Sequence, residues 1–487
     1  MNKNIASLEP KNVWGHFYEI TQQPRPSKHE EKIRQLMVNF AHKNKLEVKV
    51  DEIGNVIIRK PATLGMENRK GVILQAHLDM VPQKNADKKH DFVKDPIEAY
   101  VDGDWVTANG TTLGADNGMG CAAIMAVLDS KTLKHGPLEA LFTIDEETGM
   151  TGTFALKKGQ LSGDILMNLD SEIEGELNVG CAGGMDATIT LPCKLEAPAS
   201  DMDTFKIEVK GLKGGHSGMD IILGRGNANK LMNRLLLDII SNCSARIAAL
   251  DGGSLRNAIP RESFATVMVP KAKTEKFKKR VDAFFADTKA ELSLVESDYI
   301  VVCEKTTKPK MVVSPSSARK LCNLVYGIPN GVIRMSDVMP GIVETSTNMA
   351  VVKLEKEVLS IACLLRSSVD SAKEDLAQTM KSVVALTPGA KIELTGAYPG
   401  WKVNLKSSIL KTMQETYRKL CGKKPKVMAI HAGLECGLLG GTYKNWDMIS
   451  FGPTIVHPHS PDEKVLISSV KLFWDYLVIT LENIPKK

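Results

Sequence analysis

The 487-residue sequence has few aromatic side chains, no low-complexity tract and no apolar run approaching the roughly 20 residues of a membrane span. Its first residues, MNKNIASLEPKNVWGHF, also lack the apolar segment of a secretory signal. The nine cysteines form no Cys-x-x-Cys pair, and most lie inside apolar runs, which fits a reducing compartment. We therefore expect a globular, cytoplasmic protein that does not bind membranes.

The net charge of +6 is spread over many lysines and arginines and is not concentrated in one stripe. Short basic runs such as Lys278-Lys279-Arg280 and Lys423-Lys424 are typical of a solvated surface. The sequence has no zinc-finger motif and no basic stripe interleaved with aromatic residues. Nucleic-acid binding is therefore not expected.

The length of the chain exceeds what one hydrophobic core normally holds, so at least two domains are expected. A β-α-β rhythm up to about residue 185 returns after the turn at Tyr398–Trp401. Residues 1–185 and 398–487 should form an α/β domain, with a mixed, mainly parallel sheet and helices on both faces. Residues 186–397 should form an inserted α+β lid, in which the order of elements runs through twice.

Three short apolar segments end in histidine or carboxylate side chains. They are Val72–Ala76 before His77, Leu141–Ile144 before Asp145-Glu146-Glu147, and Ile165–Leu169 before Asp170. A helix at Asn117–Leu128 follows Asp116, a residue type suited to capping a helix N-terminus. Since binding sites in α/β sheets form beyond the carboxyl ends of the strands, we expect these polar side chains to converge.

Several carboxylates in one cleft raise one another's pKa values unless cations neutralise them. Imidazole and carboxylate donors without nearby thiolates suit zinc or manganese. Asp79 lies two residues after His77, on the same side of the strand, and can hold the imidazole from behind. Asp116 is well placed to bridge two ions, while Glu146 and Glu147 can divide proton transfer and metal binding between them.

Five segments together resemble a known family: His77–Asp79, Gly114–Gly118, Asp145–Gly149, Asn168–Glu172 and His459–Glu463. They look like the dinuclear metallopeptidases that include aminoacylases, carnosinases and glutamate carboxypeptidases, and most of all like bacterial aminoacyl-histidine (Xaa-His or β-Ala-His) dipeptidases. The likeness covers nearly the whole chain in the same order. It implies hydrolysis of unblocked dipeptides, including carnosine, by water that two divalent ions activate. Zinc is favoured, with manganese or cobalt as alternatives.

The resemblance also implies a role for each site residue. His77 and Asp170 would bind one ion, Glu147 and His459 the other, and Asp116 both. Glu146 would be the general base and Asp79 would orient His77, with a cis peptide bond after Asp116. In the lid, His216 would polarise the scissile carbonyl, and Asn257, Arg366 and the loop containing Gly433 would contact the substrate.

Other interpretations stay open at this point. His457 competes with His459, Asp145–Glu147 and Gly214–Gly218 could be plain turns, and Arg366 could form a structural ion pair. The same site could serve an N-acyl-amino-acid deacylase or an aminopeptidase or tripeptidase, and the fold could belong to a non-catalytic binding protein. His216 could act within its own chain or from a partner subunit, and a homodimer through the lid is slightly favoured.

Overall fold

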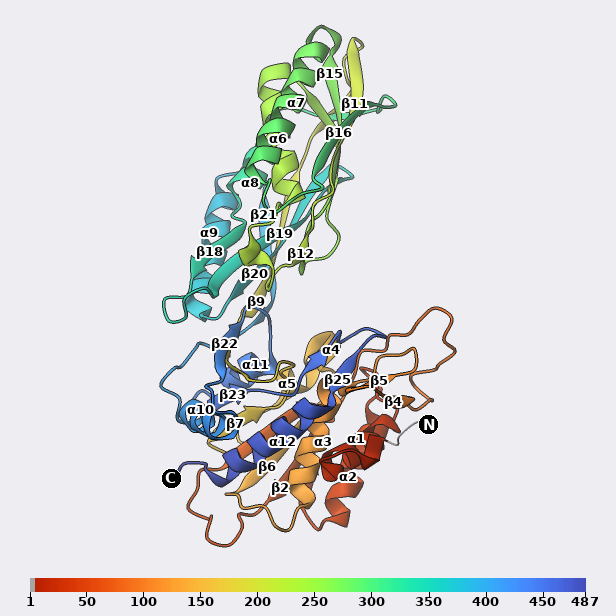
Figure 1. Ribbon diagram of the computed structural model, residues 1–487. Coiled ribbons are helices and arrows are strands. Elements are labelled where there is room, and N and C mark those ends of the chain that lie inside the picture. Colours follow the sequence, from red (N-terminus) through yellow and green to blue (C-terminus); the bar gives the residue numbers. More distant parts are fainter. Residues whose placement is uncertain (1–4) are drawn as a thin grey trace. The chain divides into compact units, whose positions relative to one another are not determined.

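The computed structural model describes residues 5–487, which fall into two compact units (Figure 1). Unit 1 runs from the start of the described chain to Gly180 and continues in Trp401–Ala429 and Leu434–Lys487. Unit 2 comprises Cys181–Gly400 and the short segment Ile430–Gly433, which the sequence assigned to the resumed first domain. The roles of the two units as catalytic domain and lid stay predictions.

An eight-stranded mixed sheet forms the centre of unit 1. Its order is β1 (Glu47–Val50), β2 (Val56–Lys60), β6 (Leu138–Thr143), β3 (Val72–His77), β7 (Ile165–Asn168), β23 (Asp447–Ser450), β8 (Glu176–Cys181) and β22 (Lys426–Ile430). The four central strands β6, β3, β7 and β23 are parallel, and β1, β2 and β8 pair antiparallel beside them. All residues of β3, β6 and β7 are buried, which explains why most of their residues are apolar.

Helices and a second, smaller sheet complete unit 1. The helices are α1 (Lys11–Thr21), α2 (Glu31–Lys43), α3 (Ala115–Asp129), α4 (Glu146–Gly149), α5 (Thr151–Ala155), α10 (Ser408–Cys421), α11 (Glu435–Thr442) and α12 (Ile467–Glu482), with a 3₁₀ turn at Ile5–Ser7. The four-stranded sheet has the order β24 (Ile455–Val456), β25 (Lys464–Leu466), β5 (Trp105–Ala108) and β4 (Ala99–Asp102). Local signals set some helix ends: the Ser407 hydroxyl caps α10, and Gly422 ends it in a left-handed conformation.

Unit 2 consists of two halves with the same β-α-β-β-α-β order. One half contains β11 (Met202–Lys210), α6 (Ala228–Cys243), β13 (Arg246–Gly252), β15 (Ser263–Pro270), α7 (Thr274–Glu291) and β16 (Ile300–Lys305). The other contains β9 (Gly183–Pro192), α8 (Pro315–Gly327), β19 (Val343–Glu355), β20 (Val358–Ser367), α9 (Asp370–Ala385) and β21 (Lys391–Tyr398). The doubling expected from the sequence is therefore present. The half that begins with β11 is inserted into the other half, after its first long strand, β9.

Both halves join in one sheet of the order β16-β11-β15-β13-β19-β20-β9-β21, with β18 (Gly331–Met335) paired to β19. The helices lie along one side of this sheet (Figure 1), and their apolar faces form a common core with it. Shorter elements are β10 (Leu195–Glu196) with β17 (Val312–Val313), β12 (Gly215–His216) with β14 (Ala258–Ile259), and the 3₁₀ turns η2 (Ile221–Leu223) and η3 (Lys271–Lys273).

Across residues 5–487, no helix combines the length and the apolar character that crossing a bilayer requires.

The turn after β11 supports a prediction about the stability of unit 2. Gly211 has a φ of +78°, and an added Cβ would lie 2.1 Å from the carbonyl oxygen of Asp298. Gly224 has a similar φ of +66°, but its Cβ position is open. Gly211→Ala should lower the thermal midpoint, because it adds an overpacking cost of about 1–3 kcal/mol to the cost of a left-handed alanine. Gly224→Ala, the matched control, should bear only the backbone cost. Equal midpoints in circular-dichroism melts would contradict this account.

Candidate active site

The carboxyl ends of the parallel strands in unit 1 bring His77 and Asp170 together, as expected from the sequence. His77 is the last residue of β3, and Asp170 follows β7, the strand paired beside it. The His77 Nε2 atom lies 3.0 Å from Asp116 Oδ1 and 3.3 Å from Asp170 Oδ1. These three residues form one group whose donor atoms could hold a metal ion.

A second group shares Asp116 with the first. The His459 Nε2 atom lies 3.2 Å from Asp116 Oδ2 and 3.1 Å from Glu147 Oε2. Asp116 therefore directs one carboxylate oxygen to each group, as a bridging ligand must. His457 is exposed, and of the two competing histidines it is His459 that reaches Asp116 and Glu147.

Glu146 lies within reach of both groups without belonging to the bridged pair. Its carboxylate lies close to the carboxylate of Glu147 and the imidazole of His77. Glu146 is the first residue of the short helix α4. Burial raises the pKa of the Glu146 carboxyl well above its ordinary value, and the neighbouring carboxylates of Asp170, Glu435 and Glu147 add to the rise. A carboxyl group whose proton affinity is raised next to metal ligands is suited to proton transfer.

The electrostatics of the cluster fit bound cations. Burial raises the pKa of Asp170 to about 7. Within the described chain, Glu147 Oε1 is buried without a hydrogen-bond partner, and so is Asp170 Oδ1 apart from its 3.3 Å ion-pair contact with His77 Nε2. A divalent ion would satisfy both oxygens and neutralise the excess negative charge. The donor set of two imidazoles and three carboxylates, with no thiolate, suits zinc and similar ions. The described residues thus contain candidate ligands for metal ions.

Asp79 stands behind the ligands and contacts both His77 and the turn that carries the glutamates. Its Oδ1 atom lies 3.4 Å from His77 Nδ1, while the shorter contact of that nitrogen, 3.1 Å, is to the Asp79 main-chain oxygen. The carboxylate also accepts hydrogen bonds from the backbone N–H groups of Glu146 and Glu147, at 3.0 and 3.2 Å. Although burial opposes ionisation, His77 and these donors hold the Asp79 pKa at about 2. Asp79 therefore positions the backbone of both glutamates as well as the imidazole of His77.

The backbone around Asp116 differs in one respect from the sequence-based expectation. Asp116 does not cap α3: the N-cap position is Gly114, with a φ of 70°, and Asp116 itself has non-helical dihedral angles. The expectation was wrong because the Asp116 side chain contacts His77 and His459, so it is not available to the helix N-terminus. The predicted cis peptide bond between Asp116 and Asn117 is confirmed.

Two buried charged residues that the sequence analysis did not single out hold the Asp116 loop. The Glu463 carboxylate accepts hydrogen bonds from four successive backbone N–H groups, those of residues 113–116, at 2.7–3.3 Å. The Arg25 guanidinium donates to the carbonyl oxygens of Leu78, Asp79 and Gly114. Glu463 belongs to the His459 motif and could have been found there, whereas Pro24-Arg25-Pro26 carries no comparable signal.

Glu172 is a further carboxyl group beside the cluster. Burial raises its pKa to about 9, and the negative charges of Asp116 and Asp170 contribute. Glu172 lies within the Asn168–Glu172 motif, but no role was predicted for it from the sequence. Its spacing of two residues from Asp170 was the available signal.

The predicted lid residues lie in unit 2, where His216 and Arg366 are neighbours. The His216 Nε2 atom lies 3.4 Å from an Arg366 guanidinium nitrogen, and Nδ1 accepts backbone N–H hydrogen bonds from Gly218 and Met219. Burial and the charge of Arg366 lower the pKa of His216. A lowered pKa favours the neutral imidazole near pH 7, and the two backbone donors require Nδ1 to be unprotonated.

Asn257 and the loop of Gly433 adjoin the same histidine. The main-chain oxygen of Asn257 accepts a hydrogen bond of 2.8 Å from the N–H of Ser217, while the residue itself is exposed. Gly218 leaves no room for a Cβ atom, which would lie 2.0 Å from the carbonyl oxygen of His431, two residues before Gly433. Unit 2 thus brings the histidine loop, the Asn257 loop and the Gly433 loop together.

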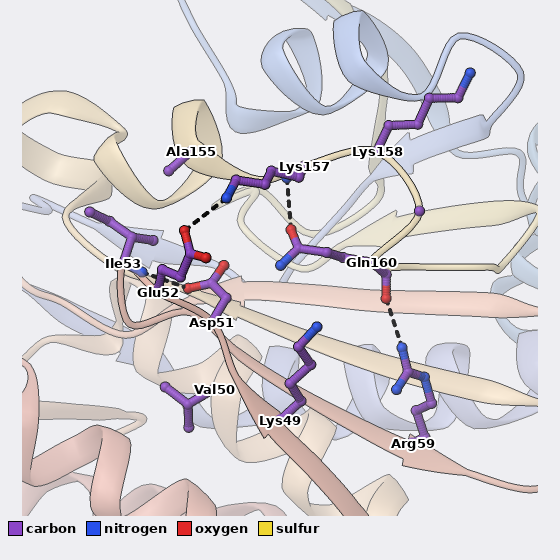
Figure 2. A pocket seen from close by; sticks show the side chains of 11 residues that line it. Lys49, Val50, Asp51, Glu52, Ile53, Arg59, Ala155, Lys157, Lys158 and Gln160 are labelled. Carbon is purple, nitrogen blue, oxygen red and sulfur yellow. Dashed lines mark hydrogen bonds and ion pairs between the residues drawn. The ribbon is translucent and has the colours of Figure 1, made fainter.

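A hollow at the edge of the unit 1 sheet, shown in Figure 2, has a volume of about 560 Å³ and is lined by other residues. Its basic side chains include Lys49, Arg59 and Lys157. Lys157 pairs with Glu52 at 2.8 Å, and Arg59 donates to the main-chain oxygen of Gln160 at 2.7 Å. Because Lys157 and Arg59 already contact protein acceptors and the candidate metal ligands do not line the hollow, the hollow is not a candidate active site.

Comparison with known proteins gives consistent results over the whole chain. The chain is 47% identical over 483 residues to the cytosol non-specific dipeptidase of Escherichia coli, with 99% of each protein covered. The crystal structure of aminoacylhistidine dipeptidase from Vibrio alginolyticus matches with a TM-score of 0.95 and 49% identity, over 100% of this chain and 99% of that one. The aminopeptidase PepT of Bacillus cereus shares the fold at 15% identity, with a TM-score of 0.58 and 98% and 99% coverage.

The family resemblance inferred from the five motifs is confirmed by a model of the family that matches residues 73–483, a span that includes His77, Asp116, Glu147, Asp170 and His459. With a full-length relative at 47% identity beside it, the chain belongs to peptidase family M20/M25/M40.

Proposed function

We propose that the protein is a metal-dependent dipeptidase that hydrolyses unblocked dipeptides, including those with carboxyl-terminal histidine such as β-Ala-His. The observation that carries the proposal is the pair of ligand groups that share Asp116, with Glu146 beside them. The relatives from E. coli and Vibrio alginolyticus, which are named a dipeptidase and an aminoacylhistidine dipeptidase, support the substrate class.

In this proposal, the two groups would hold two divalent ions. His77 and Asp170 would hold one, Glu147 and His459 would hold the other, and Asp116 would serve both. Zinc is favoured, with manganese or cobalt as alternatives, because all three accept imidazole and carboxylate donors. When bound, the ions supply Lewis acidity that polarises the substrate carbonyl and makes a nearby water more acidic.

Glu146 performs the proton transfers. Its carboxylate accepts the proton of the attacking water and later delivers it to the amine that leaves when the peptide bond breaks. Asp79 holds the backbone of Glu146 and Glu147 in place through their N–H groups, so that one glutamate can bind metal while the other remains available. Because their backbone is held in place, the two neighbouring glutamates can take different roles, one in metal binding and the other in proton transfer.

The lid residues complete the reaction in this proposal. His216 donates a hydrogen bond from Nε2 to the oxygen that becomes negative, a role that its neutral state and its accepting Nδ1 support. Arg366, only 5% exposed, grips the substrate carboxylate, and Asn257 and Gly433 contact the peptide. A homodimer through unit 2 is part of this proposal.

We further propose a cytoplasmic location, which the name of the E. coli relative supports, with small peptides as the substrates and no role in binding nucleic acid or membranes.

The substrate class is tested by assaying β-Ala-His, Ala-Ala, a tripeptide and an N-acetyl amino acid side by side with the metal-loaded protein. We expect hydrolysis of both dipeptides and little hydrolysis of the tripeptide and the blocked amino acid. Preference for the N-acetyl substrate would instead indicate a deacylase, and preference for the tripeptide an aminopeptidase. No hydrolysis of any of them, with zinc or manganese added, would favour a binding protein.

Glu146→Gln tests the assignment of the general base. We expect kcat to fall by about 10²–10⁴-fold, because the amide cannot accept the proton, while the bound metal content stays at the wild-type value. Glu415→Gln, at an exposed position of α10, is the matched control and should leave kcat unchanged. Steady-state kinetics and elemental analysis measure the two quantities. Wild-type kcat in a metal-loaded Glu146→Gln protein would rule out the assignment.

A further inference from the structure

Beneath the candidate metal ligands, a row of polar side chains crosses the buried sheet of unit 1. Gln75 on β3 lies beside Asn168 on β7, which lies beside Ser450 on β23, which in turn lies beside Asn178 on β8. All four are at most 3% exposed. Parallel apolar strands have no structural need for such a row, since each polar group in it must find a partner.

Hydrogen bonds connect this row from end to end. Asn168 donates to Gln75 Oε1 at 2.5 Å and accepts from the Ser450 hydroxyl at 2.5 Å. Ser450 and Ser171 contact each other at 2.7 Å, and Asn178 donates to Ser171 at 2.8 Å. Gln75 and Asn168 each stand two residues before a candidate ligand, His77 and Asp170, so the row lies one step below the ligands along the strands.

Glu435, the first residue of α11, joins this row from outside the sheet. It is fully buried, and its carboxylate accepts hydrogen bonds from Gln75 Nε2 at 2.5 Å, from the Thr143 hydroxyl at 2.8 Å and from the Thr153 hydroxyl. All three donors are neutral. A buried carboxylate bound only by neutral donors is costly unless cations lie nearby.

The three donors belong to the elements that carry the candidate ligands. Gln75 and His77 share β3, Thr143 pairs beside His77 and ends β6 just before Glu146, and Thr153 lies in α5, which follows α4. One carboxylate therefore ties the end of β3, the end of β6 and α5 to each other. Movement of any one of them would shift His77 relative to the glutamates of α4.

We propose that Glu435 is a positioning residue of the metal centre, whose carboxylate fixes the ends of β3 and β6 so that His77 and Glu147 meet the geometry that the ions require. It contacts the ligand-bearing elements and acts through them. The inference rests on the proposed metal-dependent function. Outer partners that orient metal ligands typically contribute 10–100-fold to affinity.

The experiment compares Glu435→Gln with Glu139→Gln. Glu139 is also a buried glutamate, 6% exposed, but it lies at the opposite end of β6 and accepts from Arg59 and from the N–H groups of Ser162 and Gly163. Zinc affinity is measured by competition with a chromogenic chelator, and the stability of the metal-free proteins by thermal unfolding. Glu435→Gln should weaken zinc binding by about 10–100-fold. Glu139→Gln should lower the thermal midpoint and leave zinc affinity unchanged.

Zinc affinity of Glu435→Gln within twofold of wild type would overturn the inference, and so would equal losses of affinity in both variants. If Glu435→Gln does not fold, Gln75→Leu replaces it, because this change removes the 2.5 Å link and leaves the carboxylate. Its zinc affinity should also fall, and an unchanged value would overturn the inference. A wild-type protein that binds no zinc, manganese or cobalt would contradict the proposed function instead.

Discussion

Repulsion among carboxylates at the ends of buried parallel strands is the constraint on which the rest of this structure depends. Asp116, Glu147 and Asp170 meet two imidazoles there, with Glu146 beside them. Burial raises the pKa values of Asp170 and Glu146, so these two carboxyl groups hold protons more readily than exposed ones unless cations are present. Divalent ions bound there would remove that conflict and would provide the chemistry of peptide hydrolysis. In the proposed function, stability and activity at this edge of the sheet therefore depend on the same charges.

Much of the fold could be predicted from patterns that burial produces. The central strands were recognisable because complete burial leaves mostly apolar segments, and the repeated element order of unit 2 followed from its alternating strands and long helices. The edge strands β1 and β18 were missed because their mostly exposed residues show no apolar run. Helices α1 and α2 were also missed, although each buries one apolar face.

The candidate site was predictable where its chemistry is local in the sequence. The candidate ligands follow strands or open a helix, and the family motifs placed them in order. The structure brings all five together: His77, Asp116, Glu147, Asp170 and His459. Their roles as ligands stay proposals. Residues whose partners lie far away in the sequence are marked by no motif. Arg25 reaches carbonyl groups more than fifty positions away, and Glu435 meets Gln75 across 360 positions. Only the folded sheet shows that these side chains adjoin the site.

Counting the zinc ions bound by the wild type and by variants of Asp116 and Asp170 tests this account most directly. Purified wild-type protein, Asp170→Asn and Asp116→Ala would each be titrated with zinc and analysed by inductively coupled plasma mass spectrometry after removal of free metal. The account predicts two tightly bound ions in the wild type, one in Asp170→Asn and weakened binding of both in Asp116→Ala, since Asp116 belongs to both ligand groups. A wild type that binds a single ion, or an Asp116→Ala protein that keeps one ion at wild-type affinity, would contradict it.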